Sequence, residues 1–455
     1  MVTDGIGNTL GKGVAFLRAH GLTPLREVLP PDVFHRLWPG KPRPHTILVP
    51  EVVFWLMATV AFGDGSMAGG VEAFWASLRV LLPNLRIQPV TEEAFCTARK
   101  LLPLKFFLRL FADVVHRFSA QVRPLRWKGR RLLGSDGTEV ELRRRGHLAK
   151  LFPPSGNHLG RRGHPQARLV GLVGLWDGIC YAFRWTNLDV GEQQSLRRML
   201  RYLDPLDLLL LDRNFADKAT LAGVRARGAD CLCHMPSNRF LKLARTPTPS
   251  RRKEEWYVQI PLPPELRQPY PPSGPELRAR ILEYQVPGFR TSWLITTLLD
   301  TTEYSYEELV TLYHERWRQE TFHLEWKHTL QLSNLRSETA KGLLKEVLVQ
   351  LTINNLIRWV MAQAAPPSLR PVDLKFLEAK RLILAAVPSM TAAPVGLLPG
   401  LFRQLLDAVA KQRILVRPGR AYPRRWDARG RPKGHGKIAV PAKLPPPKEI
   451  ASAPI

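Results

Sequence analysis

The first part of the chain has the hydrophobic spacing of α-helices. Up to about residue 125, apolar residues recur at helical spacing in segments that Pro and Gly interrupt. Thr91 is a suitable N-cap, because its hydroxyl can accept a hydrogen bond from the first turn, and Glu92 and Glu93 follow it. The pattern predicts a helical domain over residues 1–125. Its helices are expected at residues 31–37, 50–62, 67–82, 91–102 and 104–120.

From about residue 126 the pattern changes to that of β-strands. Residues 208–211 are all leucine, which suits a central strand covered on both faces. Asp136 and Asp212 each follow a predicted strand, so we expect them to meet at one edge of a sheet. An Asp-Gly turn at 177–178 would join two neighbouring strands. Residues 140–142 are expected to be either the hairpin partner of the strand at 131–135 or its extension. The other predicted strands are 168–176, 180–185, 208–211 and 229–234, with a helix at 192–202.

The middle of the chain interrupts this sheet pattern. Residues 236–289 are rich in Pro, Arg and Lys and contain only short strand-like pieces. After them a β-branched strand returns, Ser305 is expected to N-cap a long helix, and residues 338–361 are expected to form a second helix beside it. The predicted strands here are 255–260, 280–286 and 291–298.

The segment from 313 to 327 carries the most unusual polar pattern. It contains no Gly or Pro and is predicted to be one continuous helix. At about 100° per residue, four polar side chains share one narrow arc, with Trp317 and Leu324 on its apolar shoulder. The four are Tyr313, Arg316, Glu320 and Lys327, and the expected solvent face opposite is His314, Glu315, Arg318 and Glu325. The alternative is a solvated helix with incidental ion pairs.

The spacing of these four residues is Tyr-x2-Arg-x3-Glu-x6-Lys. It resembles the signature of DDE transposases of the insertion-sequence-4 family, and all four positions match. Two further motifs of that family are present, Asp136-Gly137-Thr138 and Asp212-Arg213-Asn214-Phe215. Family members usually carry Gly in place of Asn214, and Asn tolerates a left-handed backbone better than most residues.

The resemblance implies a DNA transposase that binds the inverted-repeat ends of an insertion sequence, cleaves them and transfers the strands. By that resemblance Asp136, Asp212 and Glu320 are the catalytic residues and the metal ligands. Two ions of Mg²⁺ or Mn²⁺ are expected, since both prefer carboxylate oxygens. Asp136 would bridge the ions, Asp212 would bind one, and Glu320 the other. Tyr313, Arg316 and Lys327 would hold phosphates of the transposon end.

The resemblance also implies a fold class. It is α/β, with an RNase H-like (retroviral-integrase) core, a β-rich insertion, a helical N-terminal domain and a helical C-terminal region. The expected division is a DNA-binding domain at 1–125, the core at 126–235 and 290–364, the insertion at 236–289, a helical region at 365–411 and a basic, disordered tail at 412–455.

Some relatives cut the second DNA strand by folding the transposon end into a hairpin. That step needs a base held against an aromatic ring. Trp293 begins the strand that leads out of the insertion, where hairpin-forming relatives carry a Trp, so it is the expected DNA-contacting ring. Trp256 and Trp317 are alternatives, and a Trp in an apolar strand is otherwise a core residue.

The charge of the chain agrees with a nucleic-acid partner. Its 67 Lys and Arg against 39 Asp and Glu give a formal net charge of +28, which favours binding to a polyanion such as transposon-end and target DNA. The tail at 412–455 is strongly basic and suits contact with the DNA backbone. A membrane surface is the alternative partner, but amphipathic basic helices and lipidation motifs are lacking. A homodimer is expected in the synaptic complex.

Other sequence features bear on the cellular location, on a zinc site and on alternative functions. Four cysteines make no disulfide framework, and a signal-peptide pattern is lacking, so we expect a cytoplasmic, nucleoid-associated protein of a prokaryote. Cys231, Cys233 and His234 invite a zinc hypothesis, yet a second ligand pair is missing nearby. Two other functions are alternatives, namely a non-catalytic DNA-binding regulator derived from a transposase and a host nuclease or resolvase. The intact acids disfavour the first, and the Tyr/Arg/Lys set disfavours the second.

Overall fold

A computed structural model divides the chain into two compact units. The first unit is Met1–Asp207 with Arg316–Gln412, and the second is Leu208–Glu315 with Arg413–Ile455. Most of the predicted helix at 67–82 and of the basic tail lies outside the described residues. The structure describes residues 32–38, 48–62, 69, 71–72, 76, 90–122, 125–157, 160–161, 163–236, 248–249, 252–267, 275–286, 291–415, 424–426 and 432–435.

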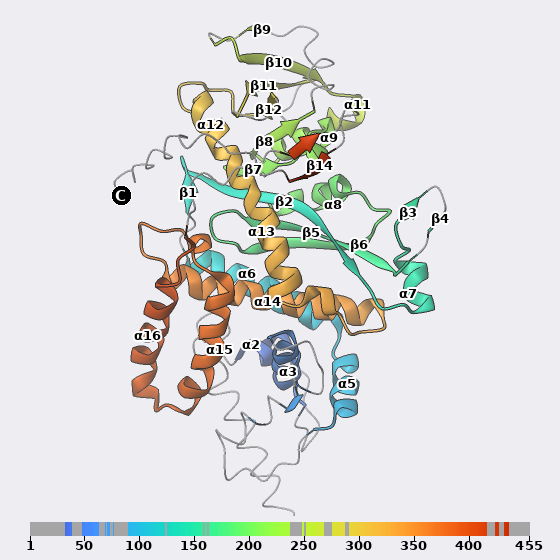
Figure 1. Cartoon of the computed structure of the whole chain (residues 1–455), viewed down its shortest axis with the longest axis vertical. Coiled ribbons are helices and arrows are strands. Elements are labelled where there is room, and N and C mark those ends of the chain that lie inside the picture. The colour runs from blue at the N-terminus through green and yellow to red at the C-terminus, as the bar shows by residue number, and fades with distance from the viewer. Residues whose placement is uncertain are drawn as a thin grey trace, which may run out of the picture. The chain divides into compact units, whose positions relative to one another are not determined.

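The first unit contains an antiparallel sheet in the order β6-β5-β2-β1 (Figure 1). The predicted turn between β5 and β6 is confirmed, and Gly178 in it has φ +75°, which glycine adopts without strain. The residue bounds are β1 Arg126–Trp127, β2 Arg130–Glu141, β5 Gln166–Gly174 and β6 Cys180–Asn187, with a separate pair β3 Gly156–Asn157 and β4 Gly160–Arg161.

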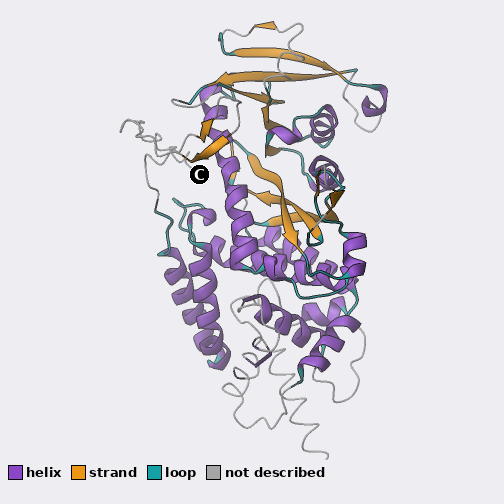
Figure 2. Cartoon of the chain, turned by 45° about the vertical axis from the view of Figure 1, so that its right-hand side comes forward, coloured by secondary structure: helices purple, strands orange, loops and turns teal. Residues whose placement is uncertain are grey.

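Helices cover this sheet and form the rest of the first unit. α14 is buried on every face, and it runs beside α6 below β5 and β6 (Figure 1, Figure 2). The Asn355 amide bonds both the N–H and the carbonyl of Cys180, which fixes α14 to the edge strand β6. The helices are α2 Asp32–Leu37, α3 Pro50–Phe62, α5 Glu92–Leu101, α6 Leu104–Gln121, α7 Gly146–Leu151, α8 Glu192–Met199, α14 Ala340–Ala364, α15 Phe376–Ala392 and α16 Leu398–Ala410.

The second unit contains a mixed sheet in the order β7-β8-β12-β11-β10-β9. β7 and β8 are parallel and the other neighbours are antiparallel, so β10 and β11 of the predicted insertion extend the same sheet as β12. The elements are β7 Asp207–Leu211, β8 Asp230–Met235, β9 Thr248–Pro249, β10 Glu255–Pro261, β11 Glu276–Tyr284, β12 Ser292–Thr296, α9 Lys218–Arg225, α11 Pro264–Arg267 and α12 Tyr306–Tyr313. In the basic tail, β13 Arg424–Trp426 pairs with β14 Pro432–His435.

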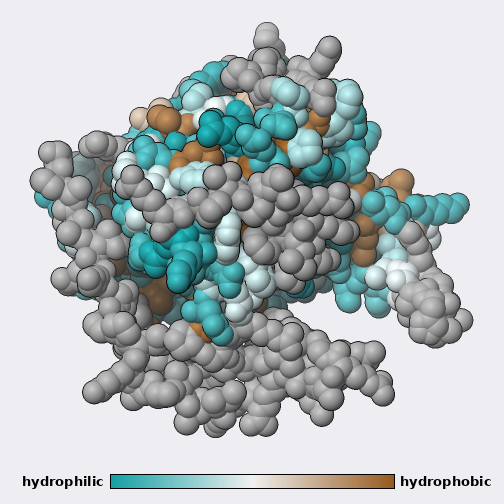
Figure 3. All heavy atoms as spheres, turned by 90° about the horizontal axis from the view of Figure 1, so that it is seen from above, coloured by the Kyte–Doolittle hydropathy of each residue, from teal (hydrophilic) through white to brown (hydrophobic). Residues whose placement is uncertain are grey.

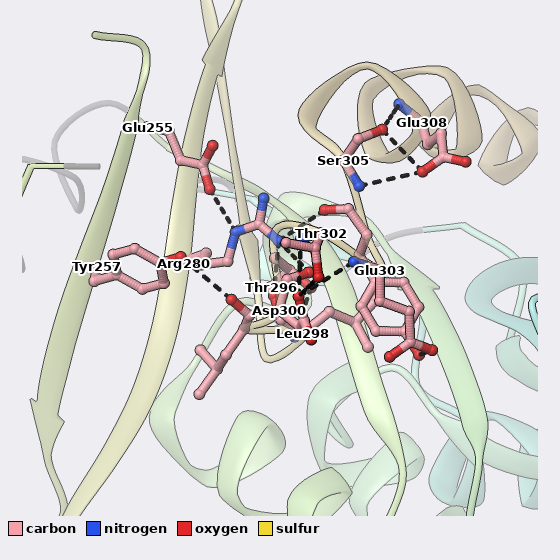
Figure 4. Close-up of polar contacts among 12 residues, drawn as sticks. Glu255, Tyr257, Arg280, Thr296, Leu298, Asp300, Thr302, Glu303, Ser305 and Glu308 are labelled. Atoms are coloured by element: carbon pink, nitrogen blue, oxygen red, sulfur yellow. Dashed lines mark hydrogen bonds and ion pairs between the residues drawn. The ribbon is translucent and has the colours of Figure 1, made fainter. Parts of the chain in front are cut away.

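A buried arginine ties the insertion strands to the loop before α12 (Figure 4). Arg280 on β11 pairs with Glu255 on β10 at 2.6 Å and donates to the carbonyls of Leu298 and Tyr304. A buried arginine is stable only when its charge is paired and hydrogen-bonded, and here the Glu255 carboxylate and the loop carbonyls do both. The loop ends at Ser305, whose hydroxyl accepts from Glu308 N–H in a capping box, as the sequence predicts.

The segment from 313 to 327 is helical but not one regular helix. α12 ends at Tyr313, a 3₁₀ turn covers His314–Trp317, α13 covers Arg318–Leu324, and a π-turn covers Glu325–Thr329. The prediction of a single 3.6-residue period is therefore wrong.

The change of period moves residues off their expected faces. Trp317 is 63% exposed and Leu324 is 58% exposed, although both were expected on an apolar shoulder. Glu325, expected in solvent, pairs with buried Arg358, and Arg318 pairs with Asp373 at 2.8 Å. Both partners are distant in the sequence, which is why the local pattern could not indicate them.

The described surface is largely polar. In the face drawn in Figure 3, hydrophilic residues predominate and hydrophobic ones are scattered. Among the described residues, the helices are all too short or too polar to cross a membrane.

Candidate active site

Asp136 lies within a strand and not at its end. The pairing of β2 with β5 continues through Asp136 opposite Gly171 to Glu141 at the end of β2. The expectation that Asp136 ends a strand is therefore wrong, and the alternative that residues 140–142 extend the first strand is confirmed up to Glu141. Gly137 is not at a turn, and an added Cβ there would displace the Glu192 side chain of α8. The Asp136 carboxylate is half-buried and accepts from the Gly137 N–H at 2.8 Å.

Glu320 lies on α13, which packs against β2 close to Asp136. Gln319, the residue before Glu320, is buried over Gly134, where an added Cβ would collide with its amide. The Glu320 side chain is 49% exposed, and its Oε1 is 3.4 Å from Arg316 Nη2. The first unit therefore presents a solvent-accessible carboxylate on a helix that is docked on the strand of Asp136.

His323 strengthens this docking one turn after Glu320. Burial and, to a smaller extent, the Lys327 charge lower the pKa of His323 to about 4, although a hydrogen bond with the Asp136 backbone acts to raise it. The imidazole is therefore neutral near pH 7. Trp326 packs beside it, and its indole lies over Gly171, where a Cβ would be 2.7 Å from Cη2.

Some polar atoms around the Asp136 strand have no hydrogen-bond partner among the described residues. They are Ser135 Oγ, both polar atoms of the Gln319 amide and His323 Nε2. Such buried, unmet groups are rare and cost stability.

Asp212 follows directly after β7 in the second unit. Its backbone is extended, its carbonyl accepts from Phe215 N–H at 2.9 Å, and its side chain is half-buried. The pKa of the buried Cys233 thiol is raised by a hydrogen bond with Cys231 and by burial, and also by the negative charge of Asp212. Cys231 and Cys233 are both fully buried among apolar residues, as core cysteines are.

Tyr313 contacts the strand that ends at Asp212. It is only 7% exposed, and its hydroxyl donates to the Leu211 carbonyl at 3.3 Å. Its ring stacks on His234 with the centroids 6.3 Å apart. Sequence reasoning missed this bond, because Tyr313 and Leu211 lie far apart in the chain and only the burial of a Tyr at a helix end hints at a partner.

The family model described as the transposase DDE domain matches residues 127–356, which include all three acids. The chain belongs to the DDE transposases. It is 24% identical over 352 residues to the transposase InsG for insertion sequence element IS4 of Escherichia coli strain K12, covering 76% of this chain and 78% of that one. A cryo-EM structure of the piggyBac transposase synaptic complex with hairpin DNA superposes with a TM-score of 0.43 at 10% identity, covering 89% of this chain and 85% of that one.

The predicted membership of the insertion-sequence-4 family is thereby confirmed. The chain is therefore an enzyme that catalyses DNA cleavage and strand transfer, and its partner is DNA. DDE transposases use divalent metal ions. The alternative of a non-catalytic regulator is therefore not needed to explain the chain.

The metal ligands predicted for this transposase are divided between its units. Asp136 and Glu320 belong to the first unit and Asp212 to the second. Within the described ranges, His, Cys, Asp and Glu side chains do not gather in a group of three that could hold a metal. The three carboxylates nevertheless offer hard oxygen donors, which fit Mg²⁺ or Mn²⁺ better than softer metals.

The other residues predicted to contact DNA differ in exposure. Arg316 is largely buried beside Glu320, and Lys327 is half-buried in the π-turn. Trp293 is half-buried on β12, where it pairs with Glu283 and Met235. Their contacts with DNA remain predictions.

Proposed function

We propose that Asp136, Asp212 and Glu320 are the catalytic residues of this transposase and hold two Mg²⁺ or Mn²⁺ ions. The observation that supports this most is the docking of α13 on β2, because Gln319 and His323 bring the helix of Glu320 against the backbone of Asp136. Asp136 would bridge both ions, with Asp212 and Glu320 each binding one. When bound, such ions activate the attacking oxygen and neutralise charge on the leaving one.

We also propose that the core of the transposase is RNase H-like, in two parts at 126–235 and 290–364. The support is the mixed sheet with covering helices inside the family-matched region. The strands at 236–289 would be the insertion, and the helices at 1–125 would recognise the terminal repeats. A limited proteolysis experiment that cuts first within 236–289 and leaves both core parts intact would support this division; early cleavage inside 126–235 would contradict it.

Charged residues of this transposase would bind the ends of the element, and a homodimer would hold two ends together. Arg316 can bind a phosphate through its bidentate fork, and Lys327 as a point charge. The net charge of +28 supports binding to end and target DNA. Sedimentation of the complex with a labelled end should give two protein chains per pair of ends; a single chain would contradict the dimer.

The second-strand cut would use a hairpin in which Trp293 stacks on a flipped base. Stacking of this kind contributes on the order of 1–3 kcal/mol. Trp293→Ala should leave first-strand nicking nearly intact while the hairpin product falls. Trp317, which is exposed beside Glu320, is the comparison. If Trp317→Ala alone lowers the hairpin product, the role belongs to that ring.

The test of the catalytic assignment compares two glutamates of one helical segment. Glu320→Gln keeps side-chain volume but removes an anionic ligand, so cleavage of a labelled element end with Mg²⁺ should fall by orders of magnitude while end binding persists. Glu315→Gln, five residues earlier, should cleave like the wild type. Wild-type cleavage by Glu320→Gln would refute the assignment.

A further inference from the structure

The hydroxyl of Tyr313 touches the backbone that leads into Asp212. Tyr313 is the last residue of α12 and is almost fully buried. Its hydroxyl donates to the carbonyl of Leu211, the last residue of β7. The peptide bond that starts at this carbonyl is the one that ends at Asp212, so the hydrogen bond acts one bond away from the acid.

The ring of Tyr313 is held as firmly as its hydroxyl. It stacks nearly parallel on His234, with 28° between the planes. His234 lies on β8, the parallel neighbour of β7, where Leu211 is in register with Cys233. The tyrosine therefore spans the ends of two adjacent strands of the second unit, and its position is set by both.

This hydrogen bond limits what else Tyr313 can do. A tyrosine hydroxyl has one proton to donate. A phosphate oxygen needs that proton, yet the structure commits it to the Leu211 carbonyl. The predicted phosphate contact of Tyr313 would require this bond to break. Arg316 and Lys327 each carry several donors and face no such choice.

We infer that Tyr313 is a positioning residue for Asp212. Its hydroxyl fixes the Leu211 carbonyl, and this sets the direction in which the Asp212 carboxylate leaves the sheet. The inference rests on the proposed role of Asp212 as a metal ligand. Groups that hydrogen-bond directly to a metal ligand typically change metal affinity about 10- to 100-fold when they are altered. Tyr313 acts through the backbone next to the ligand, and we expect an effect within the same range.

The same helix supplies a matched control. Tyr306, at the other end of α12, also donates its hydroxyl to a backbone carbonyl, that of Glu283 on β11. Tyr313→Phe and Tyr306→Phe each delete one oxygen and one such bond while keeping the ring. Only the first bond adjoins Asp212. A general loss of stability should therefore affect both variants, and a loss of positioning only Tyr313→Phe.

The experiment measures Mn²⁺ binding by the full chain on a labelled element end, from the paramagnetic resonance signal of free Mn²⁺. End binding without metal is measured by fluorescence anisotropy, and the Mg²⁺ concentration for half-maximal cleavage is a second readout. Tyr313→Phe should bind the end like Tyr306→Phe, bind Mn²⁺ about 10- to 100-fold more weakly, and need more Mg²⁺ for cleavage. Asp212→Asn should lose a Mn²⁺ site.

The outcomes separate the two ideas. If Asp212→Asn binds Mn²⁺ like the wild type, the proposed role of Asp212 fails, and the inference fails with it. If Asp212→Asn loses a site while Tyr313→Phe matches Tyr306→Phe in Mn²⁺ affinity, the inference alone is overturned. If Tyr313→Phe weakens end binding at unchanged Mn²⁺ affinity, Tyr313 holds a phosphate and the inference is overturned as well.

Discussion

The strand that carries Asp136 and the strand that precedes Asp212 are built on different principles. β7 is buried along its whole length and leucine-rich, and the carbonyl at its end is met by a tyrosine hydroxyl. β2 is instead packed so closely that a Cβ at Gly134 would collide with Gln319 and Leu175, and it lies against buried polar atoms that have no partner among the described residues. Asp212 follows a strand whose side chains are buried and whose last carbonyl is hydrogen-bonded. Asp136 lies within a closely packed strand that adjoins buried polar atoms without a partner among the described residues.

This difference teaches that two acids of one proposed site can be positioned by different forces. On the Asp212 side, apolar burial stabilises the strand and a single hydrogen bond sets the direction of the carboxylate. On the Asp136 side, close packing of α13 on glycines supplies the direction, and unmet polar groups lower the stability. Removing apolar volume should therefore destabilise the Asp212 side. On the Asp136 side, adding volume should be destabilising, whereas removing an unmet polar group should be stabilising.

The largest effect is expected from removing volume at β7. Leu210 is fully buried, so Leu210→Ala should lower the free energy of unfolding by about 2–5 kcal/mol. Leu206, just before the strand, is exposed, and Leu206→Ala should change it by less than about 0.5 kcal/mol. Urea denaturation followed by circular dichroism measures both. Similar values for the two variants would show that β7 is not a filled strand.

An intermediate effect is expected from adding volume at the strand opposite Asp136. Gly171→Ala would press a methyl group into the Trp326 ring and should cost about 1–3 kcal/mol. Gly146→Ala meets no atom within 4 Å and should leave stability unchanged or raise it by up to about 1 kcal/mol. Cleavage should also fall in Gly171→Ala, since the helix of Glu320 is displaced. Wild-type stability in that variant would contradict the close packing.

The smallest effect, of opposite sign, is expected from removing an unmet hydroxyl. Ser135→Ala should raise the free energy of unfolding by about 1 kcal/mol, since its buried Oγ has no partner among the described residues. Ser305→Ala removes a hydroxyl that caps α12 and should lower it by about 1 kcal/mol. Thermal denaturation compares the signs. If both variants lose stability, the Ser135 hydroxyl makes a stabilising contact, and the contrast between the two sides fails.

Local patterns in the sequence predicted the features that depend on neighbouring residues. Thr91 and Ser305 cap the helices they were expected to cap, because a cap is formed within one turn. The leucine run was recognised as a buried strand from its composition alone. The family was recognised from side-chain types at fixed spacings, which survive even where the backbone departs from a regular helix.

Features that depend on distant contacts could not be predicted in the same way. Asp136 was expected to follow a strand, yet β2 continues past it because it pairs with β5, which is distant in the sequence. The Glu325 side chain appeared to face solvent until its partner Arg358, 33 residues later, was placed. The predicted domain boundaries, and the meeting of Asp136 with Asp212, stay predictions.

The π-turn at Glu325–Thr329 has a consequence for how the length of this segment can vary. Its wide loop is closed by the Leu330 N–H and the Glu325 carbonyl, 2.9 Å apart and five residues from one another. Such a turn holds one residue more than an α-helical turn. Loss of one residue here would restore a regular turn, whereas in an ordinary helix it would rotate everything that follows by about 100°. Lys327 sits in this wide turn, so the direction of its side chain differs from the one that a regular α-helix would give it.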